Sequence, residues 1–218
     1  MTKKELLKRY VLLVIGLFLS ALGVAAAKQG GLGVSPISSV ANIVSIKLDF
    51  FTMGTWLIIW NCVLIVGQII ILRKDFKLIQ LLQVPLSFVF GWFTDFGMWC
   101  VSAVPQDIYP VQLLMTVLGT LILAFGISLA VAANVIMNSG EAFVKAVSDK
   151  THKSFGNVKV IFDISCVVLS VILSFIFFGE LVGTREGTVI AAVCTGFAVK
   201  LFQKLVGKPV EKLLKEKS

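Results

Sequence analysis

The chain has 218 residues, of which 57% are hydrophobic and only 15% are charged, and its mean hydropathy is +0.96. A soluble domain carries about 25% charged residues, so the composition excludes a soluble globular protein and predicts an integral membrane protein with room for about six helices. The net charge of +8 comes from basic residues beside apolar runs, a placement typical of the positive-inside effect rather than of nucleic-acid binding.

Six apolar runs predict membrane-spanning helices. They cover residues 10–28, 54–72, 78–101, 110–137, 157–178 and 187–206. Two weaker segments, 33–49 and 139–154, are too short or too polar to cross about 30 Å of hydrocarbon, so we expect half-helices or surface helices there. The end of the chain, 207–218, alternates apolar residues with lysines and predicts a basic amphipathic tail on anionic lipid.

Charges in the connections between the runs predict the orientation. Four segments together carry a charge of +11: 1–9, 73–77, 138–160 and 198–218. The connections that alternate with them sum to −2. Cytoplasmic loops carry an excess of lysine and arginine, so we expect both termini in the cytoplasm, segment 33–49 on the outer side and segment 139–154 on the inner side.

The two halves of the chain repeat. Gly16 and Gly23 recur 103 residues later as Gly119 and Gly126, and the broken segment recurs at the same offset. Each half has three predicted spans, an odd number, so the second half would be inverted in the membrane, as in many secondary transporters. Chance matching between apolar helices rich in glycine and alanine is the alternative interpretation.

The predicted fold class is therefore an all-α integral membrane protein. Six transmembrane helices would form two inverted-topology three-helix repeats, each with one short broken or re-entrant helix. The first repeat covers residues 1–104, the second covers 105–206, and the tail covers 207–218.

No residue pattern typical of an enzyme is found in the sequence. The single histidine, His152, lies in a polar loop, and the chain has no HExxH, GxSxG or Walker pattern. Four cysteines lie in or at the ends of apolar runs without a CxxC pair: Cys62, Cys100, Cys166 and Cys194. They indicate apolar packing rather than disulfides or metal ligands. We therefore predict no catalytic residue, no metal, no cofactor and no enzymatic activity.

Asp163 is the strongest single candidate for a binding role. It lies inside the apolar run 157–178, where an ionised carboxylate facing lipid is costly, so it should face the bundle interior or a wet cavity. It could bind a cation or an amine, or relay protons. Its repeat partner, Asn61, can both donate and accept hydrogen bonds. The alternative is an interfacial carboxylate that reaches water or a neighbouring helix.

Both breaks suit the start of a half-helix. Ser35 and Pro36 follow a glycine-rich stretch, and proline at a first helical position wastes no hydrogen-bond donor. Free N–H groups and the positive end of the helix dipole suit an anionic or polar solute. In the second half, Gly140 and Glu141 occupy the corresponding break. Glu141 is either a binding carboxylate or only a favourable first-turn residue.

Other polar and aromatic residues lie deep in the predicted spans. Polar side chains inside a membrane often only join helices, and tryptophans near span ends often mark the membrane interface. The four candidates for lining a solute cavity are Gln68, Asn134, Trp60 and Trp92.

The sequence resembles the YczE/YyaS/YitT family of bacterial multi-pass membrane proteins in its glycine- and proline-containing breaks and the segments that follow them. The residues that carry the resemblance lie at 31–36, 51–56, 73–77, 138–141, 150–156 and 183–188. The resemblance covers nearly the whole chain. It implies a bacterial cytoplasmic-membrane protein of this architecture, mostly without an assigned activity, and it supplies no catalytic residues.

We expect a secondary transporter or permease for a small polar solute, with its site between the breaks at Pro36 and Gly140. One alternative is a substrate-binding subunit that docks on a separate ATP-driven module. Another is a membrane sensor or scaffold without transport. The expected partners are the lipid bilayer, the solute, and a homodimer partner or coupling subunits, with no nucleic acid.

Overall fold

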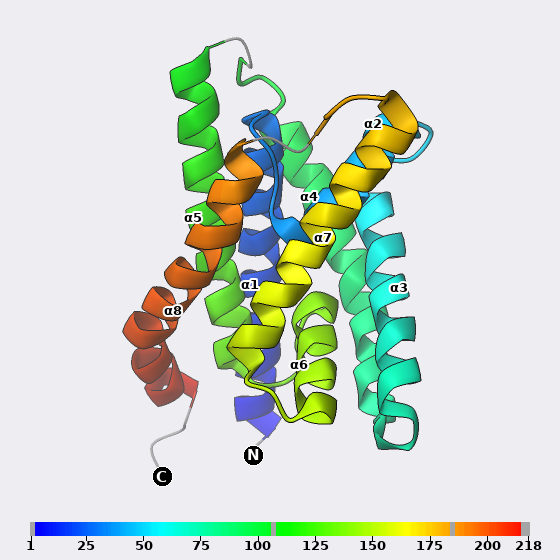
Figure 1. Cartoon of the computed structure of the whole chain (residues 1–218). Helices are drawn as coiled ribbons and strands as arrows, with labels where there is room; N and C mark the ends of the chain where they lie inside the picture. Colours follow the sequence, from blue (N-terminus) through cyan, green and yellow to red (C-terminus); the bar gives the residue numbers. More distant parts are fainter. Residues whose placement is uncertain (1–2, 106–107, 184–185, 215–218) are drawn as a thin grey trace.

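The computed structural model describes residues 3–105, 108–183 and 186–214, and these residues form helices without any strand (Figure 1). The predicted all-helical class is confirmed for this part of the chain. The α-helices are α1 (Lys3–Gln29), α2 (Pro36–Lys47), α3 (Met53–Leu72), α4 (Gln83–Val101), α5 (Tyr109–Ala133), α6 (Ser139–Thr151), α7 (Phe155–Phe178) and α8 (Glu186–Leu214). Two short 3₁₀ helices, η1 (Arg73–Asp75) and η2 (Leu78–Leu82), connect α3 to α4.

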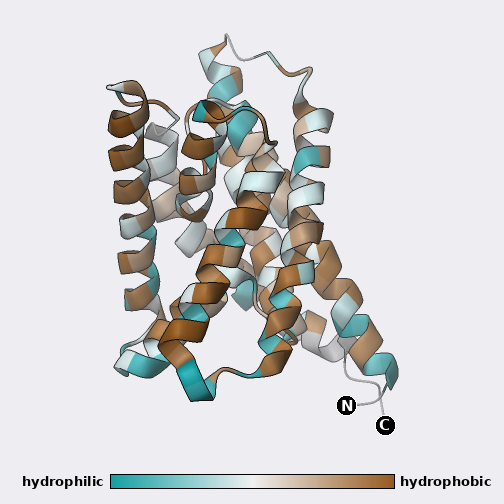
Figure 2. Ribbon diagram, turned by 90° about the vertical axis from the view of Figure 1, so that its right-hand side faces the viewer, coloured by the Kyte–Doolittle hydropathy of each residue, from teal (hydrophilic) through white to brown (hydrophobic). Residues whose placement is uncertain are grey.

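Within the described residues, five segments are long and apolar enough to cross a membrane. They are Lys3–Gln29, Met53–Asp75, Leu78–Val101, Tyr109–Ala133 and Asn157–Phe178. Figure 2 shows hydrophobic residues along much of the length of the helices, with hydrophilic residues concentrated toward the ends of the bundle. Insertion into a membrane explains why so many large apolar side chains face outward.

The sixth predicted span, 187–206, is not among these five segments and stays a prediction. It lies in α8, which continues without interruption past the predicted start of the tail to Leu214. The last four residues of the predicted tail, 215–218, lie outside the described residues. Figure 1 shows that α1 begins and α8 ends at the same end of the bundle.

One predicted span boundary is wrong. The run 110–137 is helical only to Ala133, because Asn134 adopts a left-handed conformation with φ 49° and ends α5. The apolar residues that follow mislead the prediction, since Ile136 is buried in the core although it is not helical. The run 78–101 agrees with the candidate span Leu78–Val101, and its first residues form the 3₁₀ helix η2 before α4 starts at Gln83.

At the centre of the bundle, α1 and α5 pack closely as antiparallel helices. A Cβ atom built on Gly16 would lie 2.8 Å from the carbonyl oxygen of Gly126, and one on Gly23 would lie 2.6 Å from the carbonyl oxygen of Gly119. Distances this short mean that the two backbones touch, which only small residues permit. We call these four glycines the glycine seam.

The other helices are arranged in matching pairs around this seam. α4 packs on α1 and α8 packs on α5, while α6 packs on α3 and α2 packs on α7. One pair of helices does not follow this correspondence: α3 packs along α4, whereas α7 diverges from α8 (Figure 1). The apolar core lies between α1, α3, α4 and α5, with Leu17, Leu57 and Leu123 among its buried members.

Corresponding positions also end and begin helices in the two halves. Gly31 after α1 and Asn134 after α5 both have positive φ and are 103 residues apart. Thr52 precedes α3 and Ser154 precedes α7, and each side-chain oxygen accepts a hydrogen bond from the backbone N–H three residues later. Capping at the starts of α3 and α7 is therefore the same in both halves.

Candidate functional site

The two short helices touch at their N-terminal ends. A Cβ atom built on Gly140, the second residue of α6, would lie 2.7 Å from Cδ1 of Ile37, the second residue of α2. With 12 and 13 residues, the helices are ~18–20 Å long and too short to cross about 30 Å of hydrocarbon. Each therefore ends inside the bundle, and we call this contact of Ile37, Ser139 and Gly140 the helix junction.

The start of α2 is buried and lacks a side-chain cap. Ser35 is the N-cap residue, but its Oγ donates to Oγ of Ser38 at 2.9 Å instead of accepting from the helix. Oγ of Ser39 donates to the carbonyl oxygen of Pro36 at 2.6 Å and to the carbonyl oxygen of Cys166 on α7 at 3.4 Å. The first turn of α2 thus keeps backbone N–H groups that no side chain caps, in a setting suited to a polar ligand.

A pair of glutamines braces the helix junction from the side of α3 and α4. Gln68 and Gln83 exchange two amide hydrogen bonds of 3.0 and 3.1 Å, and Nε2 of Gln68 also donates to the carbonyl oxygen of Ser139 at 3.2 Å. Oγ of Ser87 lies 3.2 Å from Oγ of Ser139. All four residues are buried, so this network joins α3, α4 and α6. Gln68 therefore joins helices, as polar side chains inside a membrane often do.

Three charged groups lie between α6 and α7. Lys159 and Asp163, four residues apart on α7, form an ion pair between Nζ and Oδ1. Glu141, in the first turn of α6, is only 7% exposed, and its Oε2 has no hydrogen-bond partner among the described residues. Burial raises the pKa of the Glu141 carboxyl above its ordinary value, and the Lys159 ammonium offsets part of this rise. We call Glu141, Lys159 and Asp163 the charged trio.

A second buried polar group without a partner lies on α3. Asn61 is 3% exposed, and its Nδ2 has no acceptor within the described part of the chain. It shares the buried face of α3 with Gln68, two turns further along. The neighbouring Trp60 packs against the apolar core, and its Nε1 is likewise buried without a partner. Native structures rarely leave such groups unpaired, so at Asn61 and at Glu141 a ligand or water would supply the missing bonds.

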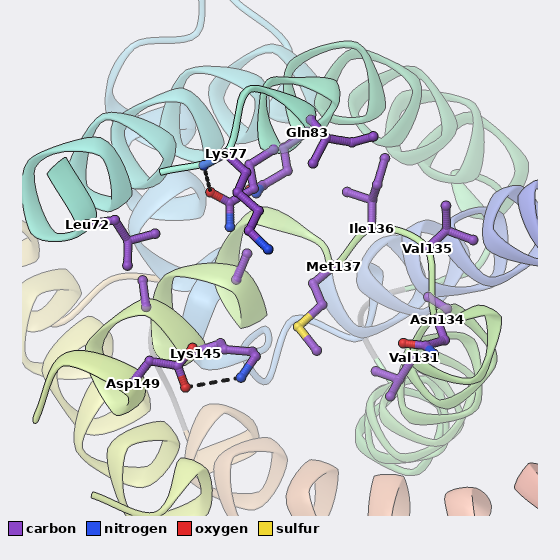
Figure 3. A pocket seen from close by; sticks show the side chains of 15 residues that line it. Leu72, Lys77, Gln83, Val131, Asn134, Val135, Ile136, Met137, Lys145 and Asp149 are labelled. Carbon is purple, nitrogen blue, oxygen red and sulfur yellow. Dashed lines mark hydrogen bonds and ion pairs between the residues drawn. The ribbon is translucent and has the colours of Figure 1, made fainter. Parts of the chain in front are cut away.

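A cavity of about 260 Å³ opens along α6 (Figure 3). It is lined by residues from the α3–α4 connection, the end of α5 with the loop after it, and one face of α6 from Ala142 to Asp149, among them Lys77, Asn134 and Lys145. Figure 3 shows the Lys77 side chain pointing into the opening and Lys145 paired with Asp149 on the facing wall. Gln83 also lines the cavity, so the buried glutamine pair connects its wall to the helix junction.

The structure brings together some of the predicted site residues and separates others. Those at or next to the helix junction are Ser35, Pro36, Gly140, Glu141 and Gln68. Asp163 lies on α7 in the charged trio, and Asn134 lines the cavity. Asn61 is buried on α3, and no hydrogen bond between it and Asp163 is found among the described residues. Trp92 is not brought to the site, because its side chain is 69% exposed on the outer surface of α4.

Some residues of the site were not singled out from the sequence. Lys159 is the clearest case, and its spacing of four residues from Asp163 on a predicted helix was a usable signal for an ion pair. Lys77 and Lys145 carried no such signal, because only the tertiary structure brings the α3–α4 connection to the wall of α6.

Comparison with known proteins gives one match. The model of a family of unknown function, DUF6198, matches residues 7–204. That range includes both short helices, the glutamine pair and the charged trio. The match gives no support to the YczE/YyaS/YitT resemblance, which stays a prediction. No curated protein and no solved structure matches the chain.

Proposed function

We propose that this chain, which belongs to DUF6198, a family of unknown function, is a permease for a small polar solute in the bacterial cytoplasmic membrane. The observation that carries the proposal is the helix junction, where two half-length helices meet beside Glu141, whose Oε2 is buried without a partner among the described residues. A second such group, Nδ2 of Asn61, lies on the same buried face of α3 as Gln68, which bonds the junction. Non-helical backbone at membrane depth is tolerated only inside protein or along a water-filled path. Secondary transporters use such helix breaks to bind their solutes.

The glycine seam supports the inverted repeat on which this proposal relies. When each residue is moved by 103 positions, the contact of Gly16 with Gly126 becomes the contact of Gly119 with Gly23, and both contacts are present. Reciprocal contacts between antiparallel helices are those of a two-fold axis perpendicular to the helices. For helices that cross a membrane, such an axis lies in the membrane plane, as inverted repeats require.

The unequal packing of the two halves supports alternating access. α3 packs along α4, whereas the corresponding helices α7 and α8 diverge. The cavity opens at the end of the bundle that holds the α3–α4 connection and the last turns of α6, where Lys150 lies 3.8 Å from Asp75. The loop charges favour a cytoplasmic location for this end. The structure is therefore interpreted as a state with access from the cytoplasm, and exchange of the two packing arrangements would open the other side.

The binding-subunit alternative is less favoured. A subunit of that kind would need a small-residue face on its first helix to dock on a coupling protein. In this chain, the small residues that would form that face, Ala21 and Ala25, are fully buried, and Gly23 between them packs against α5. The permease proposal uses this face for internal packing and needs no second protein.

Ligand-dependent thermal unfolding of the purified full chain tests the proposal. The panel would contain vitamins, amino acids, nucleobases and inorganic ions, because a solute at 100 times its Kd adds about 2.7 kcal/mol to the free energy of unfolding. We expect a saturable shift that disappears in Asn61→Leu, a variant that loses the amide but keeps similar volume. The matched control is Trp92→Leu, which changes an outward-facing side chain.

Flux measurements in proteoliposomes then separate the candidate functions. Uptake of the stabilising solute would support the permease. Binding without uptake would support the binding-subunit alternative, and a shift that persists in Asn61→Leu would show that the solute binds away from the proposed site.

A further inference from the structure

Glu141 is the one buried carboxylate of the site that lacks a complete set of hydrogen bonds. It lies in the first turn of α6, next to the helix junction, and its Oε2 faces no donor among the described residues. An ionised carboxylate in such a setting costs several kcal/mol unless it is paired. A neutral, protonated carboxyl avoids most of this cost.

Few charged groups lie near Glu141 on the helices that pack against α6. α3, which packs on one side of α6, has no charged residue between Met53 and Leu72. α2, which meets α6 at the helix junction, carries its single charge at Lys47, in its last turn and away from the junction. On α6 itself, Lys145 is paired with Asp149 and is half exposed.

The remaining neighbour, α7, supplies the two groups that act on Glu141. Lys159 favours the ionised form of Glu141 and Asp163 disfavours it. The rings of Phe143 on α6 and Phe162 on α7 lie 5.1 Å apart and hold the two helices side by side. Lys159 is bonded to Asp163 in the structure, so its charge is already compensated and Glu141 has no counterion of its own.

We propose that the charged trio is the proton-coupling element of the permease site, in which Glu141 releases its proton when Lys159 moves from Asp163 to Glu141. The inference rests on the proposed permease function and names its coupling ion. With Glu141 protonated, this residue and the Lys159–Asp163 pair seen in the structure have a net charge of zero. In the other arrangement the Glu141 O–H proton has passed to water, the Glu141 carboxylate pairs with Lys159, and the net charge of the trio is minus one.

The cavity lies beside the helix that carries Glu141. Ala142, the residue after Glu141, lines the cavity together with Lys145 and Ala146. A proton released by Glu141 would pass around α6 to reach the cavity. No oxidant, reductant or second reactant is needed, because only a proton moves.

Infrared difference spectroscopy on the full chain in lipid nanodiscs tests the inference without any solute. The C=O stretch of a protonated carboxyl is followed from pH 4 to pH 9, and the Glu141 band is isolated by subtracting the Glu141→Gln spectrum. Glu180→Gln, in an exposed loop, is the control for removing a carboxyl elsewhere in the chain and should leave the Glu141 band in place. We expect the Glu141 band to persist above the pH range in which a free glutamate side chain loses its proton. Loss of the band within that ordinary range would overturn the inference.

The two residues of α7 provide a sharper test with opposite signs. Lys159→Gln removes the favourable cation, so the Glu141 band should persist to still higher pH. Asp163→Asn frees Lys159 to pair with Glu141, so the band should disappear at lower pH than in the wild type. Equal or same-direction shifts in both variants would overturn the coupling of the trio.

The infrared experiment tests the proton site and the solute-binding experiment tests the permease, so one proposal can fail while the other stands. Opposite shifts in the α7 variants combined with no solute in the thermal panel would leave the proton site standing and count against the permease. A solute that binds and is transported without any displaced carboxyl band would support the permease and overturn the proton site.

Discussion

The glycine seam permits a direct test of how closely α1 and α5 must pack. In Gly23→Ala, the new Cβ would lie 2.4 Å from the backbone nitrogen of Leu123 and 2.6 Å from the carbonyl oxygen of Gly119. Both neighbours are backbone atoms and cannot rotate away, so one helix must shift by several tenths of an ångström. Overpacking of this kind costs about 1–3 kcal/mol.

The reciprocal contact gives a second variant with the same expected effect. In Gly126→Ala, the new Cβ would lie 2.5 Å from the backbone nitrogen of Ser20 and 2.6 Å from the carbonyl oxygen of Gly16. The matched control is Gly196→Ala on α8, where a new Cβ would have nothing within 4 Å. Alanine is the better helix former by about 0.5–1 kcal/mol, so this control should be neutral or stabilised.

Thermal unfolding of the purified full chain measures the difference. A domain of 150–250 residues loses about 2–4 °C in Tm per kcal/mol, so both seam variants should unfold several degrees below the wild type, and the control should not. An unchanged or raised Tm in Gly23→Ala would show that the helices can separate without loss and would refute close packing at the seam. Unequal losses in the two seam variants would weaken the two-fold relation between them.

Three further predictions concern the site. The Glu141 carboxyl has a raised pKa in the folded protein. The stability it contributes is therefore complete below the ordinary pKa of a glutamate and is lost as pH rises through the folded pKa. Unfolding of the wild type and of Glu141→Gln from pH 4 to pH 9 should show this loss in the wild type alone, and parallel curves would contradict it. Gln68→Leu leaves the amide of Gln83 without its partner and removes the side-chain bond to the carbonyl oxygen of Ser139, so it should cost about 1–3 kcal/mol. Adding Gln83→Leu should recover part of that loss. Strictly additive losses in chemical unfolding would show that the pair is not coupled. Asn61→Leu replaces a buried donor without an acceptor, so the free energy of unfolding of the solute-free protein should stay the same or rise slightly. A clear loss of stability would mean that the amide has a structural partner such as an ordered water.

The sequence predicted the helices best where their limits depend on local chemistry. Pro36 cannot continue a preceding helix, and α2 begins there. Thr52 and Ser154 are typical N-cap residues, and each caps a helix. The end of α5 was missed because its cause is tertiary: Ile136 is apolar enough to extend the run, but it fills the core as part of a loop.

The site was predictable only in part, because position along a span does not specify the face of the helix. Trp92 and Gln83 both lie on the predicted span 78–101, yet Trp92 points outward and Gln83 is buried. The sequence carries no amphipathic signal that separates them, since lipid and protein interior are both apolar. The partner of Gln83 is Gln68 on another helix, and that pairing depends on how α3 and α4 cross.

The way the halves interlock explains why the site belongs to the whole chain. α6, from the second half, packs on α3 of the first, and α2, from the first half, packs on α7 of the second. Each short helix thus lies against the long helices of the opposite half, and the helix junction forms only where the two exchanged elements meet. The charged trio extends this arrangement, since Glu141 starts α6 while α7 holds both Lys159 and the backbone oxygen that Ser39 of α2 bonds. A shift of one half against the other therefore moves the junction and the trio together. Such a link between solute access and the proton on Glu141 is what coupled transport requires.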